Sequence, residues 1–420
     1  MSRDHLFCTW LAAVVAFIAA SSGCDAQPER TQTQHPEREQ PGLTVRDGRL
    51  YRHGRPYRGI GVNYCDLFQD MIHHPEEQRT PKGLRFLGEK RVPFVRFWSC
   101  GFWPSDWDLY FQDKDEWFRR MDRVVKTAEE AGVGLIPSMF WRTQTYPDLF
   151  DEYQDEWANP ESKTRQFMAT YVREVVTRYK DSPAIWGWEF ANELNLSCDL
   201  PNGMNFLGKK IPHLKVNLEK HERNLMTYKI AEVAWKAFAA EVRKYDPYRL
   251  ITTGNSRPRE CSWHNATEKS WTHDNKEQAS EVFQWMNPPP VNVVSAHFYP
   301  KHDKEPMYGG ATGIEGVLAL WKELSSTLGQ PLFVGEFSAS AHDKGETLTM
   351  EQFRALETRI LDAFLKTEVD LAAYWVFDYT KDRKGPGLVR ANNEYAWVID
   401  QIVEYNRRMQ RNPGHKGSEK

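Results

Sequence analysis

An alternation of short apolar runs with helical segments constrains the fold of this chain more than any other feature. Eight near-continuous runs rich in Val, Ile, Phe and Trp lie between residues 57 and 379. They span Tyr57–Tyr64, Val92–Ser99, Val133–Phe140, Ala184–Glu193, Arg249–Asn255, Val291–Tyr299, Pro331–Ser338 and Leu371–Tyr379. Unbroken apolar runs of this length are typical of parallel strands that are covered on both faces.

Helical periodicity fills several of the intervals between these runs. The segment Trp117–Ala131 places its apolar residues on one helical face and is followed by Gly132, which is a common helix end. Similar segments follow at Thr164–Tyr179, Thr227–Tyr245, Ile314–Leu328 and Met350–Lys366. Eight β/α units predict an α/β fold, a single-domain (β/α)8 TIM barrel with enlarged loops at the C-terminal face. The alternative is an open doubly wound sheet, but no Gly-rich phosphate turn follows the first run.

The ends of the chain indicate export. Arg3, an apolar run from Trp10 to Ala20 and small residues before Cys24 predict a signal peptide over residues 1–24, because the run is too short to span a bilayer. Small residues directly before Cys24 also resemble a bacterial lipoprotein signal, which implies a lipid anchor there. We expect a polar tether over residues 25–43, the catalytic barrel over 44–410 and a polar tail over 411–420. The predicted location is the cell envelope, or the periplasm or exterior.

Composition excludes one class of partner and raises a question about another. With 55 Lys and Arg against 58 Asp and Glu, the net charge is −3, so no basic excess exists to bind nucleic acid. Aromatic residues make up 13% of the chain and include 16 Trp. That is enough to provide flat surfaces for a ligand as well as a core. We expect a monomer.

Active sites in this fold lie at the C-terminal ends of the strands. The ends of the eight runs supply two glutamates, several aromatic residues and several hydrogen-bonding residues, a composition typical of carbohydrate processing. The candidates are Asn63, Arg96, Trp98, Trp141, Asn192, Glu193, Asn255, His297, Tyr299, Glu336, Trp375 and Asp378.

Glu193 and Glu336 end the fourth and seventh runs, which lie on opposite sides of an eight-stranded barrel. Glycoside hydrolysis needs one carboxyl group to protonate the leaving oxygen and a second to attack the anomeric carbon or activate water. A separation of about 5–5.5 Å predicts retention of configuration, and about 6.5–9.5 Å predicts inversion. The pattern therefore predicts a glycosidase and leaves its stereochemistry open.

Four short motifs occur in the same order as in a known family. The segment 185–193 reads IWGWEFANE and resembles the strand-4 motif of clan A glycoside hydrolases, and GEFS at 335–338 resembles their strand-7 motif. VRF at 95–97 and HFYP at 297–300 resemble the strand-2 and strand-6 motifs. Together these motifs resemble glycoside hydrolase family 5, the cellulase and β-mannanase family of retaining glycosidases.

The resemblance implies an endo-β-glucanase or β-mannanase that uses no cofactor and no metal. Glu193 would be the acid/base and Glu336 the nucleophile of a double displacement through a covalent glycosyl-enzyme, on β-1,4-glucan or β-mannan. Burial and the neighbouring Glu336 would keep Glu193 protonated. The remaining roles are supporting. Arg96 and Tyr299 would hydrogen-bond the nucleophile, Asn192 the sugar 2-hydroxyl, and His297 would orient the acid/base, while Trp375, Trp98 and Trp141 would contact the sugar.

Some residues fit a second interpretation. Arg96 suits a buried structural ion pair as well as a site, His297 suits the core, and Trp98 and Trp141 could fill loop interiors. Many family members carry a His near the end of strand 3, where this chain has Phe140-Trp141-Arg142, and this leaves the substrate open.

Three other functions fit the same fold. A carbohydrate-binding barrel without catalysis and a transglycosylase both suit these motifs. A metal-dependent hydrolase is disfavoured, because the first run ends Asn63-Tyr64-Cys65 without a His-x-His pair.

The mature chain has four cysteines, two after adjacent strands 1 and 2 and two after adjacent strands 4 and 5. The pairs Cys65–Cys100 and Cys198–Cys261 are hypothesised to be disulfides that join neighbouring loops. Four small buried thiols are the alternative. The loops after strands 4 and 5, about 194–224 and 256–281, are long enough to suggest walls of an extended cleft.

Overall fold

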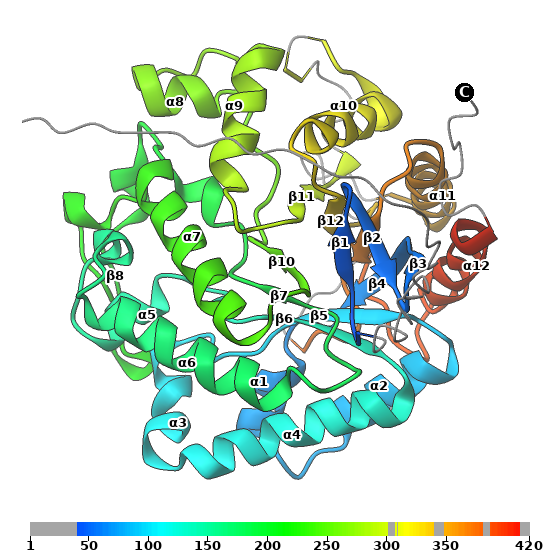
Figure 1. Cartoon of the computed structure of the whole chain (residues 1–420), viewed down its shortest axis with the longest axis horizontal. Coiled ribbons are helices and arrows are strands. Elements are labelled where there is room, and N and C mark those ends of the chain that lie inside the picture. The colour runs from blue at the N-terminus through cyan, green and yellow to red at the C-terminus, as the bar shows by residue number, and fades with distance from the viewer. Residues whose placement is uncertain (1–39, 301–306, 309, 340–347, 381–386, 412–420) are drawn as a thin grey trace, which may run out of the picture. The chain divides into compact units, whose positions relative to one another are not determined.

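The computed structural model describes residues 40–300, 307–308, 310–339, 348–380 and 387–411. All of them belong to one compact unit that begins at Glu39. Its centre is an eight-stranded parallel sheet surrounded by helices (Figure 1). The strands are β4 (Gly59–Asn63), β5 (Phe94–Trp98), β6 (Gly134–Ser138), β7 (Gly187–Glu189), β10 (Leu250–Thr252), β11 (Val294–Phe298), β12 (Leu332–Phe337) and β13 (Leu371–Tyr374).

The sheet closes on itself to form a barrel. Its order is β10-β7-β6-β5-β4-β13-β12-β11, and a parallel bridge between Thr252 and Val293 joins the two end strands. The predicted (β/α)8 fold is therefore confirmed, and the open doubly wound sheet is wrong. Each strand falls inside one of the eight predicted runs but is shorter, because the last residues of most runs already belong to the loops at the barrel mouth.

The helices alternate with the strands and cover the outside of the barrel (Figure 1). Helix α4 begins after Asp113, whose side chain accepts from Glu116 N, and ends at Gly132 with φ 67°, a conformation that costs glycine little. The helices of the main layer are α2 (Arg79–Glu89), α4 (Lys114–Ala131), α6 (Lys163–Tyr179), α7 (Tyr228–Tyr245), α9 (Lys276–Met286), α10 (Gly313–Thr327), α11 (Met350–Lys366) and α12 (Trp397–Arg411).

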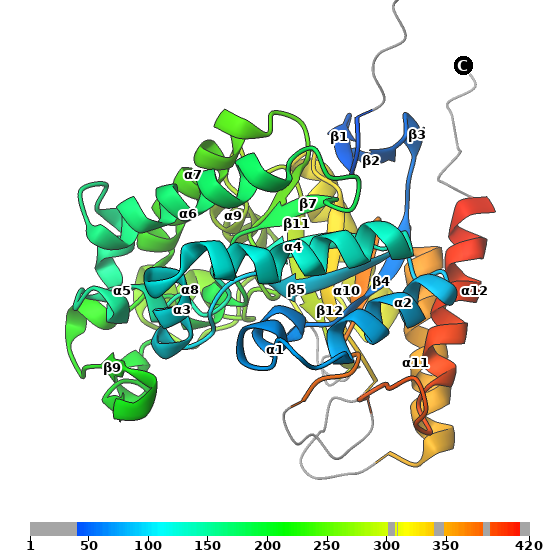
Figure 2. The same ribbon diagram turned by 90° about the horizontal axis from the view of Figure 1, so that it is seen from below.

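A small antiparallel sheet that the sequence analysis missed covers the N-terminal end of the barrel (Figure 2). It consists of β1 (Thr44–Arg46), β2 (Arg49–Arg52) and β3 (Arg55–Pro56). Leu43 fixes its position, since its N–H donates to Trp186 O and its carbonyl accepts from Leu250 N. Leu43 and Leu50 also pack into a small apolar core at this end of the strands, so the opposite end is left as the open mouth.

Shorter elements surround the mouth. The loop after β7 is the largest, and it carries four 3-10 turns and the β-hairpin β8 (Lys209–Ile211) and β9 (Val216–Leu218). We refer to residues 194–227 as the β7 insertion. The remaining mouth helices are α1 (Leu67–His73), α3 (Asp108–Gln112), α5 (Thr145–Leu149) and α8 (Ser262–Glu268).

Most of the tryptophans form the core and do not line a ligand surface. Trp107 and Trp117 stack with ring centroids 5.0 Å apart in the loop region above β5, and both are fully buried. Trp157, Trp186, Trp188, Trp235 and Trp321 are buried to the same degree. The high tryptophan content therefore reflects mainly packing between barrel and helices.

The hypothesis of two disulfides is wrong. The structure has four free, buried thiols at Cys65, Cys100, Cys198 and Cys261. The thiols of the second pair have local partners. Cys198 Sγ donates to Leu194 O, and Cys261 Sγ lies 3.4 Å from Asn265 Oδ1. These cysteines thus behave as small buried residues.

The predicted signal, the Cys24 anchor, most of the tether and most of the C-terminal tail lie outside the described residues. Among the described residues, no helix has the length and apolar character needed to span a bilayer.

Candidate active site

Two glutamates stand at the barrel mouth. Glu336 is the fifth of the six residues of β12. Glu193 lies four residues beyond the end of β7 with φ 51°, so its placement on the strand itself was wrong. Parallel pairing nevertheless continues past β7, because Phe190 N donates to Thr252 O and Glu193 N donates to Gly254 O. This pairing holds the Glu193 backbone at the mouth.

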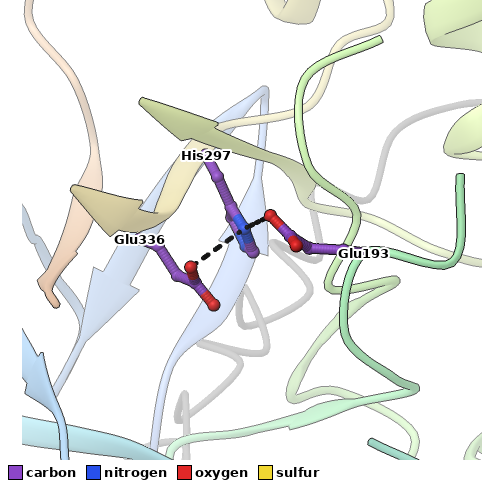
Figure 3. A group of neighbouring side chains, drawn as sticks. All are labelled: Glu193, His297 and Glu336. Carbon is purple, nitrogen blue, oxygen red and sulfur yellow. Dashed lines mark hydrogen bonds and ion pairs between the residues drawn. The ribbon is translucent and has the colours of Figure 1, made fainter. Parts of the chain in front are cut away.

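His297, from β11, connects the two glutamates (Figure 3). Its Nδ1 lies 2.9 Å from Glu193 Oε1 and 3.5 Å from Glu336 Oε2. One oxygen of each glutamate and one His297 nitrogen all lie within 4.8 Å of one another. The two carboxylates therefore face a common space.

The hydrogen-bonding partners of His297 indicate its tautomer. The residue is fully buried, and its Nε2 has no partner among the described residues. A Cβ on Gly335 would lie 2.9 Å from Nε2, so glycine is needed for this close approach. A proton on Nε2 would be a buried unpaired donor, and we therefore assign the proton to Nδ1, from which it is donated to Glu193.

Glu336 is held by two further donors. Arg96 Nη1 donates to Glu336 Oε1 at 3.1 Å, and Tyr299 OH donates to Oε2 at 2.6 Å. These are the contacts that the family resemblance implies for these residues. They place positive charge and a hydroxyl donor on the carboxylate that faces the mouth.

Arg96 is the centre of a wider buried network. Its Nε lies 2.9 Å from both oxygens of the fully buried Glu189, and its Nη2 donates to Asn192 Oδ1 at 2.7 Å. Both interpretations of Arg96 therefore hold, since it forms a structural ion pair with Glu189 and also contacts the two candidate site residues Glu336 and Asn192.

The sequence analysis missed the supporting role of Asn63. Its Oδ1 accepts from Arg96 Nη1 at 3.0 Å, and its Nδ2 donates to Gly335 O at 2.9 Å. Asn63 therefore ties Arg96 to the backbone next to Glu336. Its position at the end of the first run was the only available signal. Ser256, which hydrogen-bonds Glu193, gave no signal in a long polar loop.

The environments of the two carboxylates shift their pKa values in opposite directions. Burial raises the pKa of Glu336, as does the charge of Glu193, and together they outweigh the charges of His297 and Arg96. Burial also raises the pKa of Glu193, but the hydrogen bond and charge of His297, with Ser256 and Arg96, outweigh burial and leave this pKa below its ordinary value. The expectation that Glu193 is protonated is therefore wrong for the free protein, because His297 donates to it.

An aromatic layer lies beside the glutamates. Trp375, which follows β13, stacks on Trp141 with ring centroids 6.4 Å apart and an interplanar angle of 16°. The Arg96 guanidinium lies 4.5 Å from the centroid of the Trp141 ring. Trp98 and Trp141 are only 2% and 6% exposed, so they support this layer from beneath. Trp375 is the more exposed member.

Glu193, His297 and Glu336 each also offer an atom that could bind a metal ion. Both oxygens of Glu336 already accept hydrogen bonds from Arg96 and Tyr299, and Arg96 brings a positive charge to the site. The arrangement thus suits a pair of carboxyl groups in acid–base and nucleophilic chemistry.

Comparison with known proteins identifies related sequences and structures. A "Probable mannan endo-1,4-beta-mannosidase F" of Aspergillus flavus is 33% identical over 150 residues, which is 31% of this chain and 30% of that protein. A "Mannan endo-1,4-beta-mannosidase F" of Aspergillus fumigatus is 28% identical over 131 residues, 27% of this chain and 30% of that protein. The matched region thus spans about 30% of the length of each relative.

Solved structures share the fold across most of the chain. The endo-1,4-β-mannanase from Rhizomucor miehei has a TM-score of 0.63 at 15% identity, covering 88% of this chain and 99% of that one. A β-glucanase from Saccharophagus degradans, solved with cellotetraose, has a TM-score of 0.52 at 14% identity and covers 89% and 94%.

The family match is broader than the match to any of these relatives. The sequence profile described as "Cellulase (glycosyl hydrolase family 5)" matches residues 72–380, which include all eight strands except β4. The match thus contains both glutamates, Arg96, His297 and Trp375. The resemblance seen in the sequence is confirmed, and the chain belongs to the cellulase family, glycosyl hydrolase family 5.

Proposed function

We propose that this protein is a retaining glycoside hydrolase that cleaves β-linked polysaccharide or oligosaccharide, with β-mannan or β-1,4-glucan as its substrate class. One observation carries the mechanism. An oxygen of Glu193 and an oxygen of Glu336 lie within 4.8 Å of each other, which fits the about 5–5.5 Å of retaining enzymes better than the about 6.5–9.5 Å of inverting ones. The family match and the mannanase and β-glucanase relatives support the substrate class.

In the first step, Glu336 attacks the anomeric carbon while Glu193 donates a proton to the leaving oxygen. The C1–O bond to the leaving group breaks, and an ester bond forms between C1 and a Glu336 oxygen. Arg96 and Tyr299 hold the attacking carboxylate in position by their hydrogen bonds. In the second step, Glu193 takes a proton from water, the water oxygen attacks C1, and Glu336 is released with a second inversion.

Substrate binding prepares the proton on Glu193. The Glu193 side chain is 30% exposed in the free protein, and a bound sugar covers it. Loss of water favours the neutral form of a carboxyl group, which opposes the effect of the His297 hydrogen bond. The partly exposed face of Trp375 is the surface on which the sugar beside the scissile bond packs.

The test is a panel of β-1,4-linked manno- and gluco-oligosaccharides with wild-type protein and Glu193→Ala. We expect wild type to hydrolyse at least one series. Loss of the acid lowers kcat on oligosaccharides by about 10²–10⁴-fold. It affects 2,4-dinitrophenyl glycosides of the same sugar much less, because that leaving group needs no proton.

Glu222→Ala is the matched control, since Glu222 is an exposed glutamate of the same β7 insertion, and it should leave both rates unchanged. No hydrolysis of either series by wild type, or equal losses on both classes of substrate in Glu193→Ala, would contradict the proposal.

A further inference from the structure

A cavity of about 300 Å³ opens beside Glu193, between the β7 insertion and the loop after β6. Asn192 and Glu193 belong to its lining, while Glu336 and Trp375 do not. The cavity therefore extends from the candidate acid/base away from the candidate nucleophile. In the proposed mechanism the group bonded to the oxygen that Glu193 protonates, the leaving group, lies on this side.

The wall formed by the β7 insertion is strongly apolar. Its side chains include Leu196, Leu200, Phe206, Leu207, Leu218 and Leu225. None of these six belongs to either apolar core of the described residues or packs against one. Phe206 is 57% exposed. Apolar side chains gathered around a cavity next to reactive groups, and not used by a core, indicate an apolar ligand.

The polar side chains of the lining mostly hold the protein together. Ser197 Oγ donates to Leu194 O, and Arg259 Nη2 donates to Leu196 O. Asn224 uses both ends of its amide, donating to Glu219 O and accepting from Gln154 N. Few groups are thus left to receive the hydroxyls of a sugar ring, and the aromatic layer of Trp375 lies outside this cavity.

We propose that this cavity binds an apolar leaving group, so that the site also cleaves β-glycosides of aliphatic alcohols. The inference rests on the proposed function, because it uses Glu193 as the acid beside the leaving oxygen. The sugar lies on the Trp375 side and the alkyl chain lies against Leu200, Leu207 and Leu225. Cleavage breaks the C1–O bond, transfers the Glu193 proton to the alkyl oxygen and forms the Glu336 ester. Water then releases the free sugar and restores the proton to Glu193, with the alkyl alcohol as the second product.

The test compares ethyl, butyl, hexyl and octyl β-mannobiosides and β-cellobiosides at concentrations below micelle formation. The alkoxide leaving groups have nearly equal basicity, so that only burial of the chain changes along the series. We expect kcat/KM to rise at least about tenfold from ethyl to octyl, because each buried methylene contributes favourable transfer free energy.

Two variants locate the effect. The double variant Leu200→Asn/Leu207→Asn should reduce the octyl-to-ethyl ratio of kcat/KM to near one. Leu214→Asn is the matched control, since Leu214 belongs to the same insertion but not to the cavity lining, and it should keep the wild-type ratio. If the double variant does not fold, the wild-type series alone decides.

The outcomes separate the two proposals. Hydrolysis of oligosaccharides with no dependence on alkyl length overturns the apolar cavity and leaves the proposed function standing. A length dependence that persists in the folded double variant also overturns it. Failure to hydrolyse any mannoside or glucoside overturns the proposed function, and the inference with it.

Discussion

Glu336→Ala is expected to lower kcat on the best oligosaccharide by at least about 10⁴-fold, and sodium azide is expected to restore turnover. The alanine removes the carboxylate that forms the glycosyl ester, and it leaves space beside Arg96 Nη1 and Tyr299 OH, both donors to Glu336 in the native protein. Azide in that space attacks C1 from the Glu336 side. The product is then an α-glycosyl azide, inverted relative to the β-linked substrate.

Glu193→Ala with azide is the control that separates the two glutamates. This variant still forms the ester on Glu336 from a substrate with a good leaving group, and azide then attacks the opposite face to give the β-glycosyl azide. Thin-layer chromatography and proton NMR of the products measure both configurations. Undiminished hydrolysis by Glu336→Ala, or the reverse pair of azide configurations, would show that the two roles are wrongly assigned.

Glu357→Gln is expected to raise the free energy of unfolding by about 3 kcal/mol at pH 7 and to have little effect at pH 4. Glu357 lies on α11 behind the end of β12 and is fully buried. Its Oε2 accepts from Ala339 N at 2.9 Å, and its Oε1 has no partner among the described residues. Burial raises the pKa of Glu357 to about 8, against the opposing Ala339 hydrogen bond.

The sign follows from proton binding. Below about pH 4.3 both the folded and the unfolded chain hold this proton, and the full stability is present. Between about pH 4.3 and pH 8 the unfolded chain loses the proton while the folded chain keeps it, so stability falls as pH rises through this window. Glutamine has no proton to lose, and it avoids this loss.

Urea unfolding at pH 4, 5.5, 7 and 8 measures the difference between wild type and variant. Glu351→Gln is the matched control, because Glu351 is an exposed glutamate on the same helix, and its effect should be small at every pH. A Glu357→Gln effect of equal size at pH 4 and pH 7 would show that Glu357 is ionised in the folded protein.

The features that were predictable from sequence are those with a strong local signal. Each of the eight β-rich runs contains one barrel strand, since a strand buried on both faces must be apolar along its length. The short motifs around Arg96, Glu193, His297 and Glu336 marked residues that the fold brings together, because barrel strands all end at one mouth.

Other features depend on long-range packing that a single sequence does not reveal. The β1–β3 sheet is too short and polar to stand out, and its place depends on the contacts of Leu43 with Trp186 and Leu250. The cysteine pairs followed adjacent strands, but Cys198 and Cys261 bond within their own loops. Strand adjacency alone therefore did not predict pairing.

The electrostatics of Glu193 was the least predictable feature. The sequence indicated a buried acid near a second carboxylate, which favours protonation. The structure adds a donor, His297, at 2.9 Å, held beside Gly335, and this contact reverses the direction of the pKa shift. Similarly, the apolar wall of the cavity beside Glu193 comes from leucines scattered through the β7 insertion, with no periodicity to mark them.

The most direct test of the central claim is the anomeric configuration of the first product, followed by proton NMR immediately after mixing enzyme with a β-linked oligosaccharide. The two carboxylates lie close enough for direct attack by Glu336, and the account predicts that the new reducing end appears first as the β-anomer and then mutarotates to the mixture. Initial appearance of the α-anomer would contradict the account, because it would require a single displacement by water.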